Sequence, residues 1–369
     1  MRIVLLLSTL LAIGACNKDK DKVKKPDDTA DTADTDLTGP TGPVSCYGSY
    51  VINDESELDA LANCREIQGN LSIMGDVPDL KSLSQLEVVT LSLTIDNSDD
   101  LVDLNDLSAL TDVGANLIIM NNGKLENIDM LSAITELRDD VVIVDNPSLQ
   151  NIDGLSSISG SILDLEIRQN PLLQTIDGIT GLIIEDSIQI EDNAILADID
   201  ALSSQTFASD IRINRNDALT DLAGLSNLEG EIQDLHLHGN ALLADLTALS
   251  GITAVGEITI EDSPVLTNLA GLENISGRLR NGRGLIIARN LVLTDLSALS
   301  GITSVATDVI IDTNEVLTNF AGLENITDIE RNLTISTNTN MCQADADTYA
   351  LGRNVVGVVS IIGNTGSCN

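Results

Sequence analysis

A short pattern of apolar residues recurs along most of the chain. Each unit has the order apolar-x-apolar-x-x-Asn, as in Leu117, Ile119 and Asn122, followed by an apolar residue about every third position, as at Leu125 and Ile128. Alternation with period two predicts a short strand, and repetition at a fixed interval is typical of stacked supersecondary units. Asparagines stand at positions 122, 146, 170, 193 and 216, so successive ones are 24, 24, 23 and 23 residues apart.

The repeat predicts a coil that turns a corner at each asparagine and points its leucines inward. A unit of this length leaves no room for a long helix, so we expect parallel strands to stack coil upon coil into narrow sheets. A turning backbone leaves N–H and C=O groups that must be paired when buried. A column of stacked amides can pair them, and asparagine also tolerates the left-handed conformation that a sharp corner requires. Three coils carry Asp76, Ser98 or Ser263 at this position.

The first residues predict an exported chain. A charged start at Met1 and Arg2 precedes a short apolar run, which is the organisation of a signal peptide over 1–15. The run is shorter than the roughly 20 apolar residues of a membrane-spanning helix. Residues 13–16 read IGAC and resemble a bacterial lipobox, which implies cleavage before Cys16 and lipidation of that cysteine. An ordinary secretory signal with cleavage nearby is the alternative.

Residues 16–44 predict a disordered, acidic linker. Five lysines and two aspartates follow Cys16, and they either contact anionic headgroups or form a solvated spacer. The stretch 26–43, PDDTADTADTDLTGPTGP, is low in complexity and cannot bury a core. We expect it to act as a stalk between the anchored cysteine and a solenoid domain over 45–369.

Charge and cysteine positions narrow the class of protein further. The formal net charge is −38 and the pI is about 4.1, which argues against nucleic acid as a partner because a basic face is its usual footprint. Apart from the lipobox cysteine, the cysteines form two terminal pairs, Cys46 with Cys64 and Cys342 with Cys368. In an oxidising compartment we expect a disulfide within each pair, fastening a coil that lacks a neighbour. Free thiols are the alternative.

Three motifs at the start of the repeat and one at its end point to a family. They are CYGSYVIN at 46–53, ELDALANC at 57–64, IQGNLSI at 67–73 and NMCQADA at 340–346. The chain thereby resembles receptor L domains, the leucine-rich modules of insulin- and growth-factor-type receptors, over nearly all of 46–369. The resemblance implies an all-β, right-handed parallel β-helix, or leucine-rich solenoid, of about 12–14 coils with capped ends. It implies a ligand-binding or scaffolding module, while the receptor kinase and its signalling do not carry over.

Residues expected to face solvent on the strands include an apolar group. Ile118, Met120, Val142 and Val144 lie on two neighbouring strands. An exposed apolar patch of this kind is a candidate surface for a protein partner. A small, tolerated patch is the alternative.

Both histidines of the chain, His236 and His238, lie on one strand face. A His-x-His pair can chelate a metal, and Glu261 on the next coil could be a third ligand. Arg212 on the coil before would oppose a cation. We therefore expect no metal and no cofactor, and these three residues are only weak candidates.

One coil is longer than the others. It runs from Ser263 to Asn290, which is 27 residues, and its extra length falls in 276–284. Insertions in repeat proteins form loops, and loops carry function. Arg278, Arg280 and Arg283 cluster there, and guanidinium groups suit carboxylate or phosphate ligands. The arginines are candidate ligand-binding residues, with charge balance against acidic neighbouring coils as the alternative.

No motif in the sequence predicts catalysis. We expect a non-enzymatic lipoprotein of the bacterial outer membrane or cell surface that serves as a binding, adhesion or scaffolding module for a protein or envelope ligand. A β-helical, polysaccharide-active enzyme is an alternative, although a chain with no Trp, two Phe and three Tyr lacks aromatic platforms for sugars. A purely structural spacer in the cell envelope is a third possibility.

Overall fold

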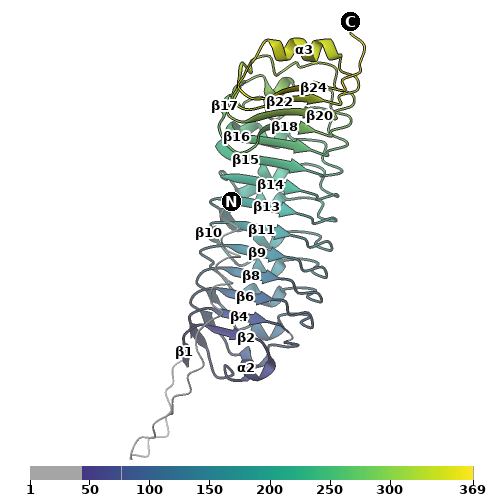
Figure 1. Cartoon of the computed structure of the whole chain (residues 1–369). Helices are drawn as coiled ribbons and strands as arrows, with labels where there is room; N and C mark the ends of the chain where they lie inside the picture. Colours follow the sequence, from purple (N-terminus) through teal and green to yellow (C-terminus); the bar gives the residue numbers. More distant parts are fainter. Residues whose placement is uncertain (1–43, 76, 369) are drawn as a thin grey trace, which may run out of the picture. The chain divides into compact units, whose positions relative to one another are not determined.

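Parallel strands, one from each coil, form a 14-stranded sheet whose order follows the chain (Figure 1). The computed structural model describes residues 44–75 and 77–368, so the expected signal peptide, Cys16, most of the linker and Asp76 lie outside the described residues. The strands of this long sheet are β2 (Tyr50–Ile52), β4 (Leu71–Met74), β6 (Leu93–Asp96), β8 (Leu117–Met120), β9 (Val141–Val144), β11 (Leu165–Arg168), β13 (Ser187–Glu191), β14 (Asp210–Asn214), β15 (Gly230–His238), β16 (Ile252–Glu261), β18 (Gly284–Ala288), β20 (Asp308–Asp312), β22 (Leu333–Ser336) and β24 (Val359–Ile362).

A second side of the coils carries three shorter parallel sheets. They are built from β1 (Ser45–Tyr47), β3 (Glu66–Gln68), β5 (Val88–Val89) and β7 (Asp112–Val113); from β10 (Gly160–Ile162) and β12 (Leu182–Ile184); and from β17 (Gly277–Leu279), β19 (Ile302–Val305), β21 (Asp328–Ile329) and β23 (Asn354–Val355).

Short 3₁₀ turns form the third side, in agreement with the expectation that no coil holds a long helix. An aspartate two residues ahead of a turn sets its start, since Asp245 accepts the backbone N–H of Thr247 at 2.7 Å and Asp295 that of Ser297 at 2.8 Å. The turns are η1 (Lys81–Leu83), η2 (Asn105–Leu107), η3 (Asp129–Ala133), η4 (Asp153–Leu155), η5 (Asp177–Ile179), η6 (Asp200–Ser204), η7 (Ala223–Leu225), η8 (Thr247–Gly251) and η9 (Ser297–Leu299), with helices α2 (Glu55–Asp59) and α3 (Gln343–Leu351) near the two ends.

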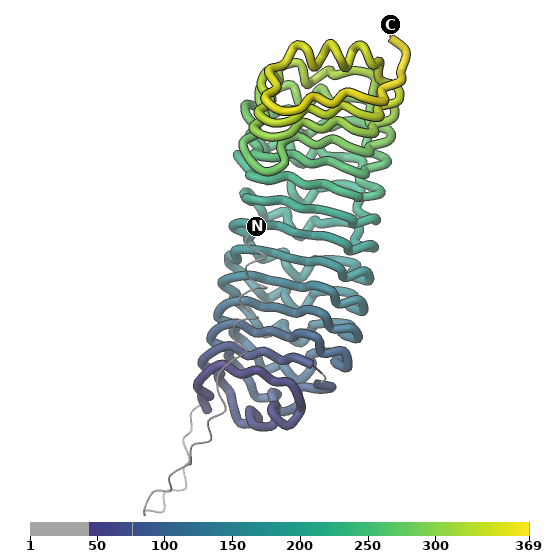
Figure 2. Tube along the Cα trace, viewed as in Figure 1, coloured from purple at the N-terminus to yellow at the C-terminus, as the bar shows by residue number. Residues whose placement is uncertain are grey.

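Aliphatic side chains fill the inside of the coils, which Figure 2 shows stacked along the chain. In one coil Leu117, Ile119, Leu125, Ile128 and Leu131 are all 0% exposed, and the same columns repeat in the neighbouring coils. Burying each such side chain contributes about 1.5–3 kcal/mol, so these columns are the main stabilising element of the stack. The predicted parallel β-helix is confirmed, and its 14-stranded sheet agrees with the expected number of coils.

The corner asparagines form the predicted ladder. Asn146 Nδ2 donates to the carbonyl oxygen of Ile119 in the preceding coil at 3.0 Å, and its Oδ1 accepts the backbone N–H of Asn122 at 3.2 Å. The prediction of a left-handed conformation at the ladder asparagines is wrong by one residue. The conformation occurs at the preceding residues, Asn121 (φ 57°) and Asp145 (φ 54°). The ladder side chain has to point into the coil, so the tight turn falls on the preceding residue, whose side chain points outward.

A second polar ladder, which was not predicted, lies at the start of the strands of the long sheet. Asn116 Oδ1 accepts the backbone N–H of Asp140 at 2.8 Å, and Asp140 Oδ1 accepts that of Asp164 at 3.2 Å. The ladder brings carboxylates of successive coils together. Burial and, next, the negative charge of Asp164 raise the pKa of Asp140 to about 6.

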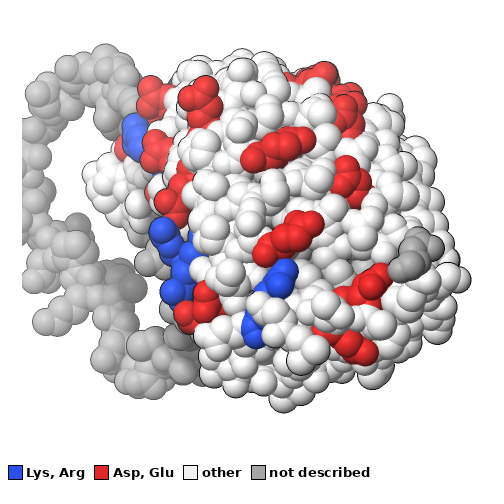
Figure 3. All heavy atoms as spheres, turned by 90° about the horizontal axis from the view of Figure 1, so that it is seen from above, with Lys and Arg blue, Asp and Glu red and all other residues white. Residues whose placement is uncertain are grey.

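A disulfide fastens each end, as predicted. Cys46 in β1 is bonded to Cys64 with Cα atoms 5.7 Å apart, and Cys342, which precedes α3, is bonded to Cys368 with Cα atoms 4.9 Å apart. The view onto the C-terminal end shows charged side chains scattered over a surface that is otherwise uncharged (Figure 3). Within 44–75 and 77–368, no helix has the length and apolar character needed to cross a bilayer.

Candidate functional site

Polar and titratable side chains form three rows across the outward face of β14, β15 and β16. Inward and outward side chains alternate along each strand, and the constant register of the coils aligns equivalent positions. The rows are Asp210, Asp234 and Glu257; Arg212, His236 and Thr259; and Asn214, His238 and Glu261.

His236 lies within reach of two carboxylates. Its Nε2 atom is 3.0 Å from Glu257 Oε1, and one ligand atom each from Asp234, His236 and Glu257 lie within 4.8 Å of one another. Although it is close to this oxygen, the buried Nε2 atom has no hydrogen-bond partner of adequate geometry. Asp234 is also bound by Arg212, whose Nη2 atom lies 2.9 Å from Asp234 Oδ2. These three side chains could hold a metal ion.

The inserted loop packs against this cluster. The backbone N–H of Arg283 donates to Glu257 Oε2 at 2.5 Å, and Arg280 reaches back to Glu231, with Nη1 and Oε1 3.5 Å apart. Gly282 has a positive φ of 51°, and a Cβ atom there would overlap Glu257 Oε2, so a larger residue would push the Glu257 carboxylate away from the loop. Glu257 is only 2% exposed as a result.

Two carboxyl groups of this face have shifted pKa values. Burial alone would raise the pKa of Glu257, but the contact with His236 and the hydrogen bond from the Arg283 amide outweigh burial and lower it. Burial and, next, the charge of Asp234 raise the pKa of Asp210. Glu257 therefore holds its negative charge more firmly than Asp210 does.

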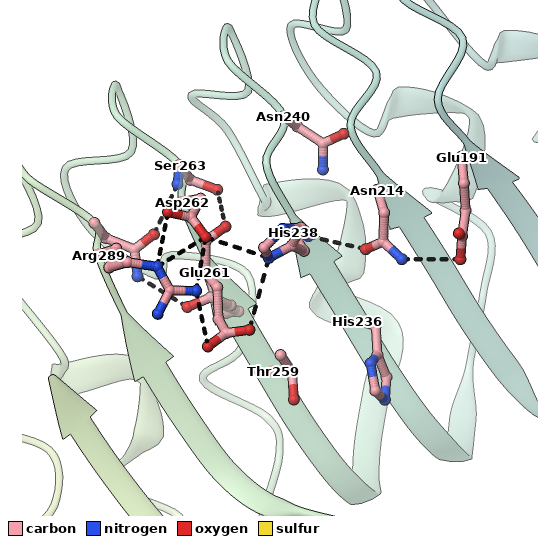
Figure 4. Close-up of polar contacts among 12 residues, drawn as sticks. Glu191, Asn214, His236, His238, Asn240, Thr259, Glu261, Asp262, Ser263 and Arg289 are labelled. Carbon is pink, nitrogen blue, oxygen red and sulfur yellow. Dashed lines mark hydrogen bonds and ion pairs between the residues drawn. The ribbon is translucent and has the colours of Figure 1, made fainter. Parts of the chain in front are cut away.

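His238 belongs to a separate network at the corner of the coils (Figure 4). Its Nδ1 atom lies 3.6 Å from Glu261 Oε2 and 3.4 Å from Asp262 Oδ2. Arg289 from the next coil binds both acids, with Nη2 2.8 Å from Asp262 Oδ2 and 3.3 Å from Glu261 Oε1. This network neutralises charge between successive coils.

The structure thus divides the three weak metal candidates. Both histidines stand on the same face of β15 (Figure 4), but Glu261 lies beside His238, and the carboxylate beside His236 is Glu257. The strand register places Thr259, not Glu261, next to His236. Glu261 alone was named from the sequence; Glu257 lies on the same face of the same strand, and spacing alone does not distinguish the two.

The three arginines of the insertion have different partners. Arg278 Nη2 is 2.8 Å from Glu330 Oε1, and Arg280 contacts Glu231. Arg283 is exposed and contributes its backbone N–H to the cluster. Among the described contacts, no single partner gathers all three guanidinium groups, and anion binding by them stays a prediction.

A hollow of about 550 Å³ lies on the side of the short sheet that contains β21 and β23. It is lined by Arg278, Ser304, Asp328, Glu330 and Asn354, together with Ile329 and Val356. Arg278 and Glu330, which both line the hollow, already form an ion pair with each other.

The four apolar candidates lie together on the outward face of β8 and β9. Ile118 pairs with Val142, and Met120 pairs with Val144. Neighbouring strands cover them in part, since Val144 is 7% exposed and the other three are half-buried. Their role as a partner surface stays a prediction.

Sequence reasoning did not single out Asp234 and Glu257. Each stands directly before the two inward residues of its coil's repeat, at the position that Asp140 and Asp210 occupy in other coils. This column of acidic residues was the available signal. It becomes meaningful only when the coils are stacked in register.

Comparison with known proteins supports a relationship for one part of the chain. The family model of the receptor L domain matches residues 63–157, from just before the end of the first disulfide loop to just beyond η4. The resemblance was expected over nearly all of 46–369, whereas the match covers only the early coils and leaves out β14 to β18. No curated protein matches the chain.

Proposed function

We propose that the chain is a bacterial surface lipoprotein, held in a membrane through Cys16, whose solenoid is a non-catalytic binding or adhesion module for a protein or envelope ligand. The match to the receptor L domain, which is a ligand-binding module, carries this proposal. The two disulfides favour an extracellular or secreted location, because such bonds persist in oxidising compartments.

The outward face of the long sheet is the surface that we propose for the ligand. Both polar ladders hold its backbone, and neighbouring strands lie about 4.8 Å apart, so the side chains keep fixed relative positions. A face that is ordered before binding loses little conformational entropy when a partner docks. The apolar pairs on β8 and β9 and the arginine-bearing loop beside β16 are the two regions that we propose for contact.

A polysaccharide-active enzyme is the second candidate. The hollow beside Arg278 contains Asp328 and Glu330, and carboxylates near an arginine are the groups that such an enzyme needs. Glu330 is held by Arg278, however, and Asp328 accepts a hydrogen bond from Asn354 at 3.0 Å. Both carboxylates already serve contacts within the fold, which favours binding over catalysis.

Capture of a partner tests the proposal. The mature chain with Cys16→Ser is immobilised and exposed to solubilised bacterial envelope. One variant carries Ile118→Ser and Val142→Ser, and a second replaces the arginines of the loop by serine at 278, 280 and 283. We expect a retained component whose binding at least one of these variants weakens about tenfold or more, as for the loss of a few central contacts.

A matched control carries three serines in place of exposed cationic residues elsewhere, Arg65, Lys124 and Arg138. It should retain full capture. Equal capture by all variants would remove both proposed contact regions. If the immobilised chain retains no more than an unrelated immobilised protein does, the result would favour a structural spacer. If the chain shortens an envelope polysaccharide, the result would favour the enzyme.

A further inference from the structure

We propose that Asp234, His236 and Glu257 bind a divalent transition-metal ion of the Zn²⁺ class on the outward face of β15 and β16. This inference is independent of the partner that the solenoid binds. The ligand atoms of the three side chains lie within 4.8 Å of one another. An imidazole nitrogen together with carboxylate oxygens is a donor set that Zn²⁺ and its neighbours accept.

The contact between His236 Nε2 and Glu257 Oε1 requires a hydrogen atom or a metal ion between these two atoms. The Nε2 and Oε1 atoms are 3.0 Å apart, and Nε2 is buried without a hydrogen bond of adequate geometry. A neutral imidazole whose lone pair faced this carboxylate would be repelled by it. A metal ion bound to both atoms turns the repulsion into coordination, and an N–H group at Nε2 is the competing arrangement.

Small movements complete the site. Bonds from Zn²⁺ to nitrogen or oxygen measure about 2.0–2.2 Å, which places neighbouring ligand atoms about 3.0–3.5 Å apart. The contact between His236 and Glu257 is already of this length. Rotation of the Asp234 side chain shortens the distances from its carboxylate to the other two ligand atoms. His236 and Asp234 are partly exposed, which leaves them room to rotate.

Further hydrogen bonds hold the carboxylate of Glu257 in position. Glu257 Oε2 accepts the backbone N–H of Arg283, and Thr259 Oγ1 lies 3.3 Å from Glu257 Oε1. Such outer contacts orient metal ligands and are part of a working site. The inserted loop therefore has a role that does not depend on its guanidinium groups, since it fixes Glu257 through a main-chain amide.

Arg212 is the main opposing charge, because it binds Asp234 Oδ2 at 2.9 Å. It occupies one carboxylate oxygen, and a carboxylate has two. Asp210 lies beside Asp234 in the strand register, so the row contains three carboxylates against this one guanidinium group. The local charge is negative and favours a divalent cation. Three protein ligands would leave a fourth position for water or for a group of a partner.

Metal titration of the mature chain tests the site. The protein carries no polyhistidine tag, is treated with chelator, and is then titrated with Zn²⁺ by calorimetry and with Co²⁺ by visible absorption. We expect one saturable site, and His236→Gln should weaken binding at least tenfold, as expected for loss of a ligand. Glu257→Gln should act in the same direction. Circular dichroism confirms that each variant is folded.

His238→Gln is the matched control, because His238 stands on the same strand face but contacts Glu261 and Asp262. It should leave the affinity for Zn²⁺ unchanged. The proposal is overturned if the folded protein binds neither ion saturably, which would leave a proton between His236 and Glu257. It is also overturned if His236→Gln has no effect, or if His238→Gln weakens binding as strongly.

Discussion

Asn146 binds two groups of Asn122 at once. Its Oδ1 atom accepts the backbone N–H of Asn122 at 3.2 Å and the side-chain amide of Asn122 at 3.0 Å. Both residues are 0% exposed, so no solvent replaces these bonds if they are lost. Asn146 thus provides hydrogen-bond partners for polar groups of the coil before it, so the substitution of this one rung tests the ladder.

Asn146→Ala should destabilise the chain strongly. The substitution leaves the carbonyl oxygen of Ile119 and the N–H of Asn122 without these partners, and each unsatisfied buried group costs about 1–3 kcal/mol. We expect a loss of about 2–4 kcal/mol in the free energy of unfolding, measured by urea denaturation. Asn105→Ala, at an exposed position, should change it by no more than about 0.5 kcal/mol. Equal effects of the two substitutions would contradict a structural ladder.

Asp140→Asn should stabilise the chain above pH 6 but not at pH 4. The folded pKa of Asp140, about 6, lies above the ordinary value of 3.8, so its contribution to stability is fully present below pH 3.8 and is lost as the pH rises through 6. Asparagine keeps the acceptor for the N–H of Asp164 and never ionises. Because Asp140 is half-exposed, we discount the effect to about 1–2 kcal/mol at pH 7.5.

Urea unfolding of the wild type and of Asp140→Asn at pH 4 and pH 7.5 measures this difference. Asp139→Asn is a control that removes the adjacent carboxylate. A gain for Asp140→Asn that is the same at both pH values would argue against a shared charge between Asp140 and Asp164.

Removing a terminal disulfide should loosen only the end that it fastens. Cys342→Ser with Cys368→Ser opens a link across 26 residues, and disulfides of this span typically contribute about 2–4 kcal/mol. Hydrogen exchange should rise in α3 and β24 and stay unchanged in β2 and α2. The pair Cys46→Ser and Cys64→Ser should give the reverse pattern. Faster exchange throughout the coils in either variant would show that the ends are not independent.

Cys16→Ser should release the protein from membranes. The lipidated cysteine is the proposed anchor, and without acyl chains the remaining contact with lipid is weak. Fractionation of cells that express each form measures the shift from the membrane to the soluble fraction. The double change Cys46→Ser and Cys64→Ser controls for the replacement of other cysteines and should remain membrane-bound. An unchanged membrane fraction for Cys16→Ser would contradict lipid anchoring at this residue.

The coil pattern was predictable because burial forces it to be regular. Leu117 and Ile119 must both point inward in every coil, so their spacing is visible in the sequence. The ladder asparagines were visible for the same reason. The left-handed residue was assigned to the wrong position because Asn146 and Asp145 both suit such a turn, and only side-chain direction separates them.

The candidate site was less predictable because it depends on contacts between coils. His236 and the arginine-bearing insertion were each noticed, but no pattern in the sequence places them together. The loop folds back so that the Arg283 amide reaches Glu257, which is 26 residues earlier in the chain. A main-chain contact of this kind depends on the path of the loop rather than on the identity of the residue that donates it.

The asparagine ladder repeats the same bonds from coil to coil, and this makes the length of the array a variable that is separate from the fold. Within a run of asparagine rungs, such as Asn122 to Asn216, each rung binds the coils before and after it, so the addition or removal of a whole coil joins equivalent rungs again. At about 4.8 Å per coil, the 14 strands span roughly 60 Å. A change in coil number would move the far end of the array by a fixed step while leaving each disulfide-fastened end intact. The reach of the protein from the attachment point proposed at Cys16 would therefore change in discrete increments.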